Sequence, residues 1–186
     1  MTLETQVKAV YIKFFVGVDL NTVKKLTQII QAKLNEGVSR FILLISSPGG
    51  NVFAGVSGYN FLKGIPAEVV THNFGSADSI ATILYCAGVK RYCVPNARFL
   101  LHGIGLDINA GLRINEKWPD EQIKSLKADR ENISKIISDN SKRKFLDVEK
   151  DILDGVVLNA QQAVDYGLVH EIKTELFEKG AEIIEI

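Results

Sequence analysis

The feature that most constrains the fold of this chain is a continuous apolar run over residues 41–45 (FILLI), with two glycines shortly behind it, Gly49 and Gly50. A run without alternating polar residues is typical of a strand that is covered on both faces. Residues 52–63 then predict a helix, so the chain passes from a buried strand through a tight turn into a helix. Such a unit favours a parallel sheet with helices packed against it.

The same alternation of strand and helix continues on both sides of this unit. Residues 8–16 (KAVYIKFFV) are rich in β-branched and aromatic side chains and predict a strand. A helix is predicted from Asp19 to about Gly37, because apolar residues recur there at helical spacing: Leu20, Val23, Leu26, Ile30 and Leu34. A strand over 67–74, a helix over 79–87 and a strand over 98–101 follow. Strands that alternate with helices require crossover connections, which predicts a largely parallel α/β sheet.

The second half of the chain shows a different pattern. Residues 119–145 predict one long helix with an apolar stripe, formed by Ile123, Leu126, Ile133, Ile136 and Ile137. A short helix over 161–166, a last strand over 169–172 and a helical tail to Ile186 are predicted after it. Because no internal repeat or linker is visible, we expect a single domain over residues 1–186.

The composition argues against several classes of function. The chain has 22 basic and 22 acidic residues, so its net charge is zero and nothing favours a nucleic-acid or membrane-surface partner. Residues 1–6 lack the features of a signal peptide, and no apolar run reaches the length of about 18 residues that a membrane-spanning helix needs. Cys86 and Cys93 lie in apolar segments, which predicts buried thiols in a reducing compartment.

Three segments carry residue types that a serine hydrolase needs. Gly49 and Gly50 follow a strand, and glycine lets backbone N–H groups approach a ligand closely. Ser79 follows a strand and opens an apolar helix, where its hydroxyl could act as a nucleophile and the N–H of Ile80 as an oxyanion donor. His102 ends a strand, the position at which α/β sheets bind ligands, and is the candidate base.

Each segment also has a purely structural interpretation. The glycines could form a tight turn without a ligand, and Ser79 could cap the helix that it opens. His102 could be a structural histidine, and His72 and His170 compete with it for the role of base. The local pattern around Ser79 is not Gly-x-Ser-x-Gly, so this is not the nucleophile turn of the α/β-hydrolases.

Together these segments resemble the Clp protease proteolytic subunit family (ClpP), serine peptidases of the ClpP/crotonase-like superfamily. Residues 47–52 (SPGGNV) are similar to the family's oxyanion loop, residues 75–81 (GSADSIA) to its nucleophile segment, and Leu101-His102 to its histidine segment. Residues 163–169 (AVDYGLV) resemble its C-terminal signature. The resemblance implies a spiral of βαβ units with a protruding handle helix at about 119–145 that interdigitates two rings, which would make the isoleucine stripe an oligomer interface; alternatively, the stripe packs on its own domain.

The chain departs from the family pattern at several positions. Counted back from Ala163 without gaps, the family's catalytic aspartate falls on Gly155, with Asp154 adjacent and Asp151 one helical turn earlier. Either Asp154 takes the role through a one-residue shift, or the aspartate is absent. Asp78 stands where the family usually has alanine, and a carboxylate there should raise the pKa of the histidine unless it points away. Ala81 replaces the usual glycine, and Gly-Ile rather than Gln-Pro follows His102.

We therefore expect a ClpP/crotonase-like α/β fold and a serine endopeptidase that cleaves peptide bonds through an acyl-enzyme. Its expected site comprises Ser79 as nucleophile, His102 as base, Asp154 as the orienting carboxylate, and the N–H groups of Gly50 and Ile80 as the oxyanion hole, with no metal and no organic cofactor. One alternative is a catalytically weak or inactive structural subunit of a Clp-like assembly. Another is a crotonase-like enzyme that acts on acyl-CoA.

Partners and location follow from the same resemblance. The expected partners are peptide or unfolded-protein substrates and further copies of the chain in homo-oligomeric rings, without nucleic acid or membrane. The N-terminal segment is short and lacks the family's apolar start and axial loop, which argues against docking to an AAA+ unfoldase. The expected location is cytoplasmic.

Overall fold

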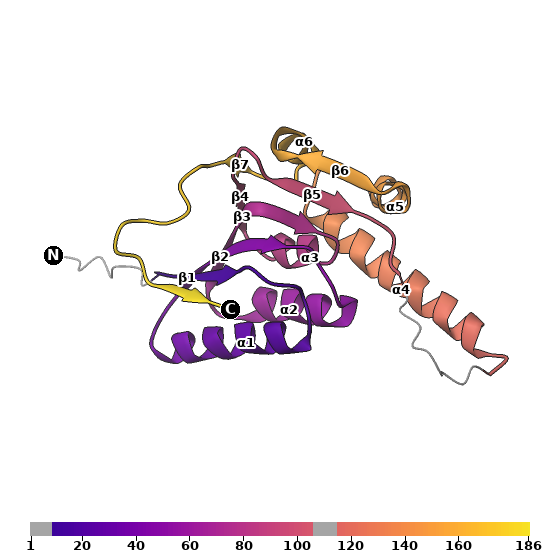
Figure 1. Ribbon diagram of the computed structural model, residues 1–186, viewed down its shortest axis with the longest axis horizontal. Helices are drawn as coiled ribbons and strands as arrows, with labels where there is room; N and C mark the ends of the chain where they lie inside the picture. The colour runs from indigo at the N-terminus through magenta and orange to yellow at the C-terminus, as the bar shows by residue number, and fades with distance from the viewer. Residues whose placement is uncertain (1–8, 106–114) are drawn as a thin grey trace.

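The computed structural model describes residues 9–105 and 115–186, so the sequence-based expectation for residues 1–6 lies outside the described residues. These residues form an eight-stranded sheet in the order β6-β5-β3-β2-β1-β8, with β4 pairing β3 and β7 pairing β4 (Figure 1). The strands are β1 Ala9–Phe14, β2 Arg40–Ser47, β3 Glu68–Asp78, β4 Lys90–Cys93, β5 Arg98–Leu101, β6 Val156–Asn159, β7 Glu171–Ile172 and β8 Ile183–Glu185.

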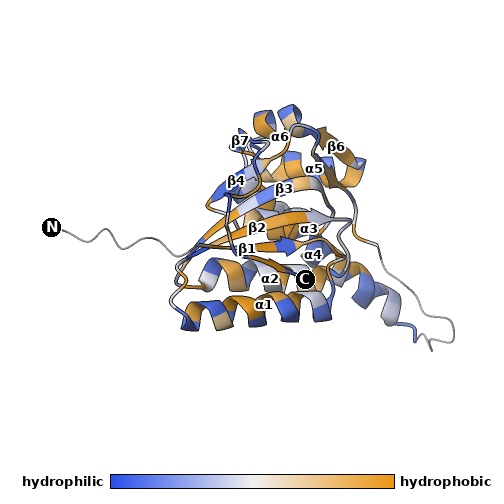
Figure 2. Ribbon diagram, turned by 60° about the vertical axis from the view of Figure 1, so that its left-hand side comes forward, coloured by the Kyte–Doolittle hydropathy of each residue, from blue (hydrophilic) through white to orange (hydrophobic). Residues whose placement is uncertain are grey.

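Three helices cover one face of this sheet: α1 Leu20–Asn35, α2 Val52–Gly64 and α3 Ala81–Cys86 (Figure 1). Asp19 caps α1 as the sequence indicates, because its carboxylate accepts the backbone N–H of Thr22 while the Thr22 hydroxyl accepts the N–H of Asp19. The strands β1 and β2 are mainly apolar, as Figure 2 shows. Leu43 and Ile45 of β2 are buried in the core between the sheet and these helices.

The long strand β3 brings the ends of several segments together. Its first part, Val70–Asn73, pairs with β4, and its last part, Ser76–Asp78, pairs with β5. All the named strand pairs are parallel except β5 and β6, which are antiparallel. The carboxyl ends of β3 and β5 therefore lie side by side, and the chain that returns as β6 runs past them in the opposite direction.

The helix predicted over 119–145 is α4 Trp118–Asp139, which ends earlier than predicted, and it is followed by a separate helix that the sequence did not predict, α5 Phe145–Asp154. The break has a local cause, because the Asn140 side chain bonds back to the carbonyl of Ile136 and the N–H of Lys142 donates to the carbonyl of Tyr166 instead of continuing the helix. The helix α6 Ala160–Tyr166 agrees with the one predicted over 161–166.

The isoleucine stripe of α4 is divided between two environments. Ile133 and Ile137 are buried in the chain's own core, as the alternative interpretation of the stripe stated. Ile123 is 50% exposed and belongs to the half of α4 that projects from the body of the molecule (Figure 1). That projecting half is largely hydrophilic (Figure 2). The projecting part of the stripe is therefore its most exposed part.

The prediction of a helix for the C-terminal tail is wrong. Its last residues form β8, which pairs with β1 in parallel and fills that edge of the sheet. The short strands β4 and β6 were not predicted either, and the strand predicted over 67–74 continues as β3 to Asp78. Cys86 and Cys93 are buried, free thiols, and burial raises their pKa values to about 12 and about 11. Within the described ranges, no helix has both the length and the apolarity to cross a membrane.

Candidate active site

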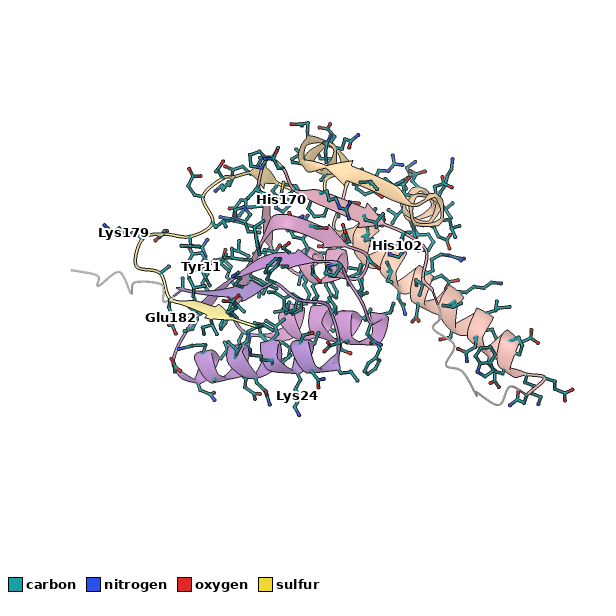
Figure 3. All side chains as sticks on the ribbon, viewed as in Figure 1. Tyr11, Lys24, His102, His170, Lys179 and Glu182 are labelled. Atoms are coloured by element: carbon teal, nitrogen blue, oxygen red, sulfur yellow. The ribbon has the colours of Figure 1, made fainter. Side chains whose placement is uncertain are left out.

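One cavity of about 210 Å³ collects the candidate residues from distant parts of the sequence. Gly50, Ser79, Ile80 and His102 all line it. It lies beyond the carboxyl ends of β3 and β5, and Figure 3 shows His102 past the tip of β5, close to α4. The rest of the wall is largely apolar and includes Val52, Leu101, Ile104, Ile133, Ile137 and Ile152.

Ser79 occupies a sharp turn between β3 and α3. Its φ is 56°, the single positive value among the described residues other than glycine, and such backbone conformations concentrate at functional sites. The turn is held by the Ser79 N–H, which donates to the Leu100 carbonyl at 2.7 Å, and by the Thr82 hydroxyl, which donates to the Ala77 carbonyl at 2.8 Å. The helix begins at Ala81, not at Ser79 as predicted, and no side chain caps it. The structure therefore gives the Ser79 hydroxyl no capping role.

The glycine loop packs directly against this turn. Gly49 has φ 89°, and a Cβ atom there would lie 2.6 Å from the Asp78 carbonyl and 2.7 Å from the Ser79 Cβ. Gly49 and Asn51 bond to Val18 through the Gly49 carbonyl and the Asn51 N–H, at 2.8 and 2.7 Å. Among the described residues, no acceptor takes the N–H of Gly50 or of Ile80. Both residues line the cavity, so their N–H groups are candidate donors to an oxyanion.

His102 is exposed at the rim, and its ring has no hydrogen-bond partner within residues 9–105 and 115–186. The antiparallel register pairs Leu101 with Val156, so the next position along places Gly155 opposite His102. Gly155 ends α5 with φ 75° and offers no side chain to orient the imidazole.

The carboxylates near this position differ in their hydrogen bonds and ion pairs. Asp151 accepts the Tyr166 hydroxyl at 2.8 Å and pairs with Arg143 at 3.3 Å, so it is held away from a role at His102. Asp154 is the last residue of α5 and is exposed, and in the described part of the chain it forms no ion pair or hydrogen bond. It is not among the residues that line the cavity.

Asp78 has a partner that the sequence did not indicate. Its side chain is 7% exposed, and its Oδ2 atom lies 2.5 Å from the guanidinium of Arg98 on the neighbouring strand. Hydrogen bonding to Asp78 raises the pKa of Arg98. The pairing of β3 with β5 places these residues together, and no local pattern in the sequence could have shown it.

The two competing histidines have structural surroundings. His72 is buried, and its Nε2 atom lies 3.1 Å from the Lys173 carbonyl. His170 packs against Arg91, whose backbone N–H donates to the His170 Nδ1 at 3.1 Å. Burial lowers the pKa of both residues. Neither lines the cavity that contains Ser79, which leaves His102 as the candidate base.

Comparisons with known proteins give a consistent result. A family model described as Clp protease matches residues 6–175. The ATP-dependent Clp protease proteolytic subunit 2 of Corynebacterium efficiens is 31% identical over 153 residues, which cover 81% of this chain and 75% of that protein. The protein of the same name from Corynebacterium glutamicum is 30% identical over 153 residues, with 81% and 74% covered.

A solved structure shows the same architecture. The structure of a ClpP1 mutant from Listeria monocytogenes matches with a TM-score of 0.79 at 21% identity, covering 91% of this chain and 92% of that one. At this identity the match shows the fold alone, and it confirms the ClpP/crotonase-like α/β fold predicted from the sequence.

Proposed function

Because the chain belongs to the Clp protease family, we propose that it is a serine endopeptidase that cleaves peptide bonds through an acyl-enzyme on Ser79. The observation that carries this proposal is the meeting of a strained serine, a histidine and two unpaired N–H groups at one cavity. Simple packing does not require these four features together.

The proposed reaction follows from their chemistry. His102 accepts the proton of the Ser79 hydroxyl as its oxygen attacks the carbonyl carbon of the substrate. The N–H groups of Gly50 and Ile80 donate to the oxygen that becomes negative. The tetrahedral intermediate collapses as His102 gives the proton to the leaving amine, which leaves an acyl-enzyme ester on Ser79. His102 then takes a proton from water, the water oxygen attacks the ester, and His102 returns the proton to the Ser79 oxygen as the acid product leaves. A neutral His102 needs an acceptor for its second ring nitrogen, and Asp154 is the proposed carboxylate because it adjoins the position that faces His102.

The cavity also favours a class of substrate. Ile133, Ile137 and Ile152 form an apolar wall, and the lining contains no charged carboxylate, lysine or arginine among the described residues. We propose that the enzyme prefers peptides with a medium-sized apolar side chain, such as leucine or methionine, before the cleaved bond. A charged side chain there would lose its hydration without gaining a partner.

A second candidate, the catalytically weak structural subunit, is favoured by one observation. The register extended by one position puts Gly155, and no carboxylate, opposite His102. Disabling the aspartate of a serine-protease triad costs about 10⁴ in kcat. This candidate keeps the fold and the assembly of a Clp-like particle but hydrolyses peptides slowly.

The test is labelling with a serine-directed fluorophosphonate, which reports an activated serine without requiring the right peptide. We expect the wild-type chain to be labelled and Ser79→Ala to be unlabelled, with Ser76→Ala as a matched control that retains labelling. Labelling that persists in Ser79→Ala would place the nucleophile elsewhere. An unlabelled wild-type chain would favour the structural-subunit function.

A further inference from the structure

Asp78 is a buried carboxylate directly before the proposed nucleophile, and the reaction described above does not use it. The residue is 5% exposed, and its Oδ1 atom has no hydrogen-bond partner among the described residues. A buried carboxylate is costly unless a counter-charge accompanies it. Arg98 supplies that counter-charge, with its Nη2 atom 2.5 Å from Oδ2 of Asp78.

The strand register places this ion pair beside the reacting groups. Asp78 lies opposite Leu100 in the ladder between β3 and β5, and the carbonyl of Leu100 accepts the N–H of Ser79 at 2.7 Å. Alternate residues of a strand share a face, so Arg98 and Leu100 extend from the side of β5 that meets Asp78. The charge on Asp78 is therefore one residue from the nucleophile in the sequence, although neither Asp78 nor Arg98 lines the cavity itself.

Few other charges face His102 from the elements around it. On α4, Arg130 is bound to Glu149 of α5 at 3.0 Å. On α5, Asp151 is bound to Tyr166 and Arg143, which leaves Asp154 as the carboxylate without a partner in the described part of that helix end. The Asp78–Arg98 pair is the nearest charged feature on β3 and β5, the two strands that carry the reacting residues.

We propose that Arg98 is a positioning residue of this active site, which neutralises Asp78 so that Ser79 and His102 act in locally uncharged surroundings. An acidic residue can stand before the nucleophile here because the neighbouring strand carries an arginine that pairs with it. Without Arg98, the carboxylate would favour the protonated form of His102 and oppose the negative oxygen at Gly50 and Ile80. The inference rests on the proposed Ser-His mechanism and adds a condition to it.

The test is a double-mutant cycle read through the NMR titration of the His102 ring, whose signals are assigned by their loss in His102→Gln. In Arg98→Ala the carboxylate is uncompensated, and we expect the pKa of His102 to rise by about 0.5–1 pH unit. The double variant Asp78→Ala/Arg98→Ala should return it to the wild-type value, and Arg98→Lys should preserve most of the wild-type behaviour. In parallel, kcat/KM near neutral pH should fall at least about tenfold in Arg98→Ala and recover in the double variant.

The control is Arg130→Ala, which breaks another partly buried arginine–carboxylate pair away from β3 and β5 and should leave the pKa of His102 unchanged. An unchanged His102 pKa in folded Arg98→Ala, or a double variant that fails to restore it, would overturn the proposal. The titration does not depend on turnover. A wild-type chain without peptidase activity would therefore count against the proposed function, while the titration still decides whether Arg98 compensates Asp78.

Discussion

Ser79 adopts a backbone conformation that costs a residue with a side chain on the order of 1 kcal/mol or more, and contacts from three segments hold it there. Leu100 accepts its N–H, Thr82 ties the turn to Ala77, and Gly49 packs against its Cβ. A serine that only connected a strand to a helix would need none of this support. In the proposed mechanism, this conformation presents the hydroxyl to the cavity while the N–H of the neighbouring Ile80 remains free.

The orienting carboxylate is the first residue-scale prediction. If Asp154 orients His102, Asp154→Asn should lower kcat by up to about 10⁴ with little change in KM, because only the histidine tautomer is disturbed. Asp151→Asn is the matched control on the same helix, and it should leave kcat nearly unchanged although it weakens the bond to Tyr166. Steady-state kinetics on an apolar peptide substrate measures both. Equal small effects would mean that neither carboxylate acts on His102.

At the scale of elements, α4 serves two purposes along its length. Its second half is part of the core through Ile133 and Ile137, whereas its first half projects with Ile123 exposed. A helix that projects from the body and carries an exposed apolar residue is a candidate surface for contact with another molecule. We propose that this half joins copies of the chain in a homo-oligomer.

Substitution of Ile123 tests that interface. A charge in a buried contact is unfavourable, so Ile123→Asp should shift the oligomer to smaller species while the unfolding midpoint of the isolated chain stays the same. Ser125→Asp adds the same charge at another exposed position of α4 and should not dissociate it. Light scattering at micromolar concentration gives the mass. A wild-type monomer would contradict the proposal, and Ile137→Asp is unsuitable as a test because it would disrupt the core itself.

At the scale of the whole molecule, two histidines connect the C-terminal region to the sheet. His72 of β3 meets the Lys173 carbonyl, and His170 meets Arg91 of β4, whose guanidinium also donates to the carbonyls of Leu168 and Asn140. Burial lowers the pKa of both histidines from the ordinary value of 6.5, so the folded chain favours their neutral form.

This arrangement predicts a loss of stability on mild acidification. As the pH falls below 6.5, the unfolded chain takes up protons that the folded chain does not. This uptake stabilises the unfolded state relative to the folded state until the pH reaches the lowered pKa values. Urea unfolding should therefore give a smaller free energy of unfolding at about pH 5.5 than at about pH 7.5, before the carboxylates titrate. His72→Gln, which keeps a donor for the Lys173 carbonyl, should flatten this dependence. A free energy of unfolding that is constant or rises over the same interval would refute it.

Many elements of the fold and several cavity residues could be predicted from local sequence patterns. The apolar run of β2, the capping residue Asp19 and the glycines of the loop act within a few residues of their position, and so the main strands and helices of the first hundred residues were predicted correctly. The cavity residues Gly50, Ser79, Ile80 and His102 follow for the same reason, since each lies at a strand end or a turn and the carboxyl ends of parallel strands meet at one edge of a sheet.

Other features were decided by contacts between distant segments. The short strands β4, β6 and β8 are too brief to carry a pattern, and they exist because a neighbouring strand supplies their hydrogen bonds. The break between α4 and α5 depends on Tyr166, and the neutralisation of Asp78 depends on Arg98 of another strand. The family resemblance suggested that Gly155 occupies the position of the aspartate. Its position next to His102 depends on the register between β5 and β6. Local sequence determined the main strands and helices, and long-range pairing determined the short strands and which side chains all these elements bring together.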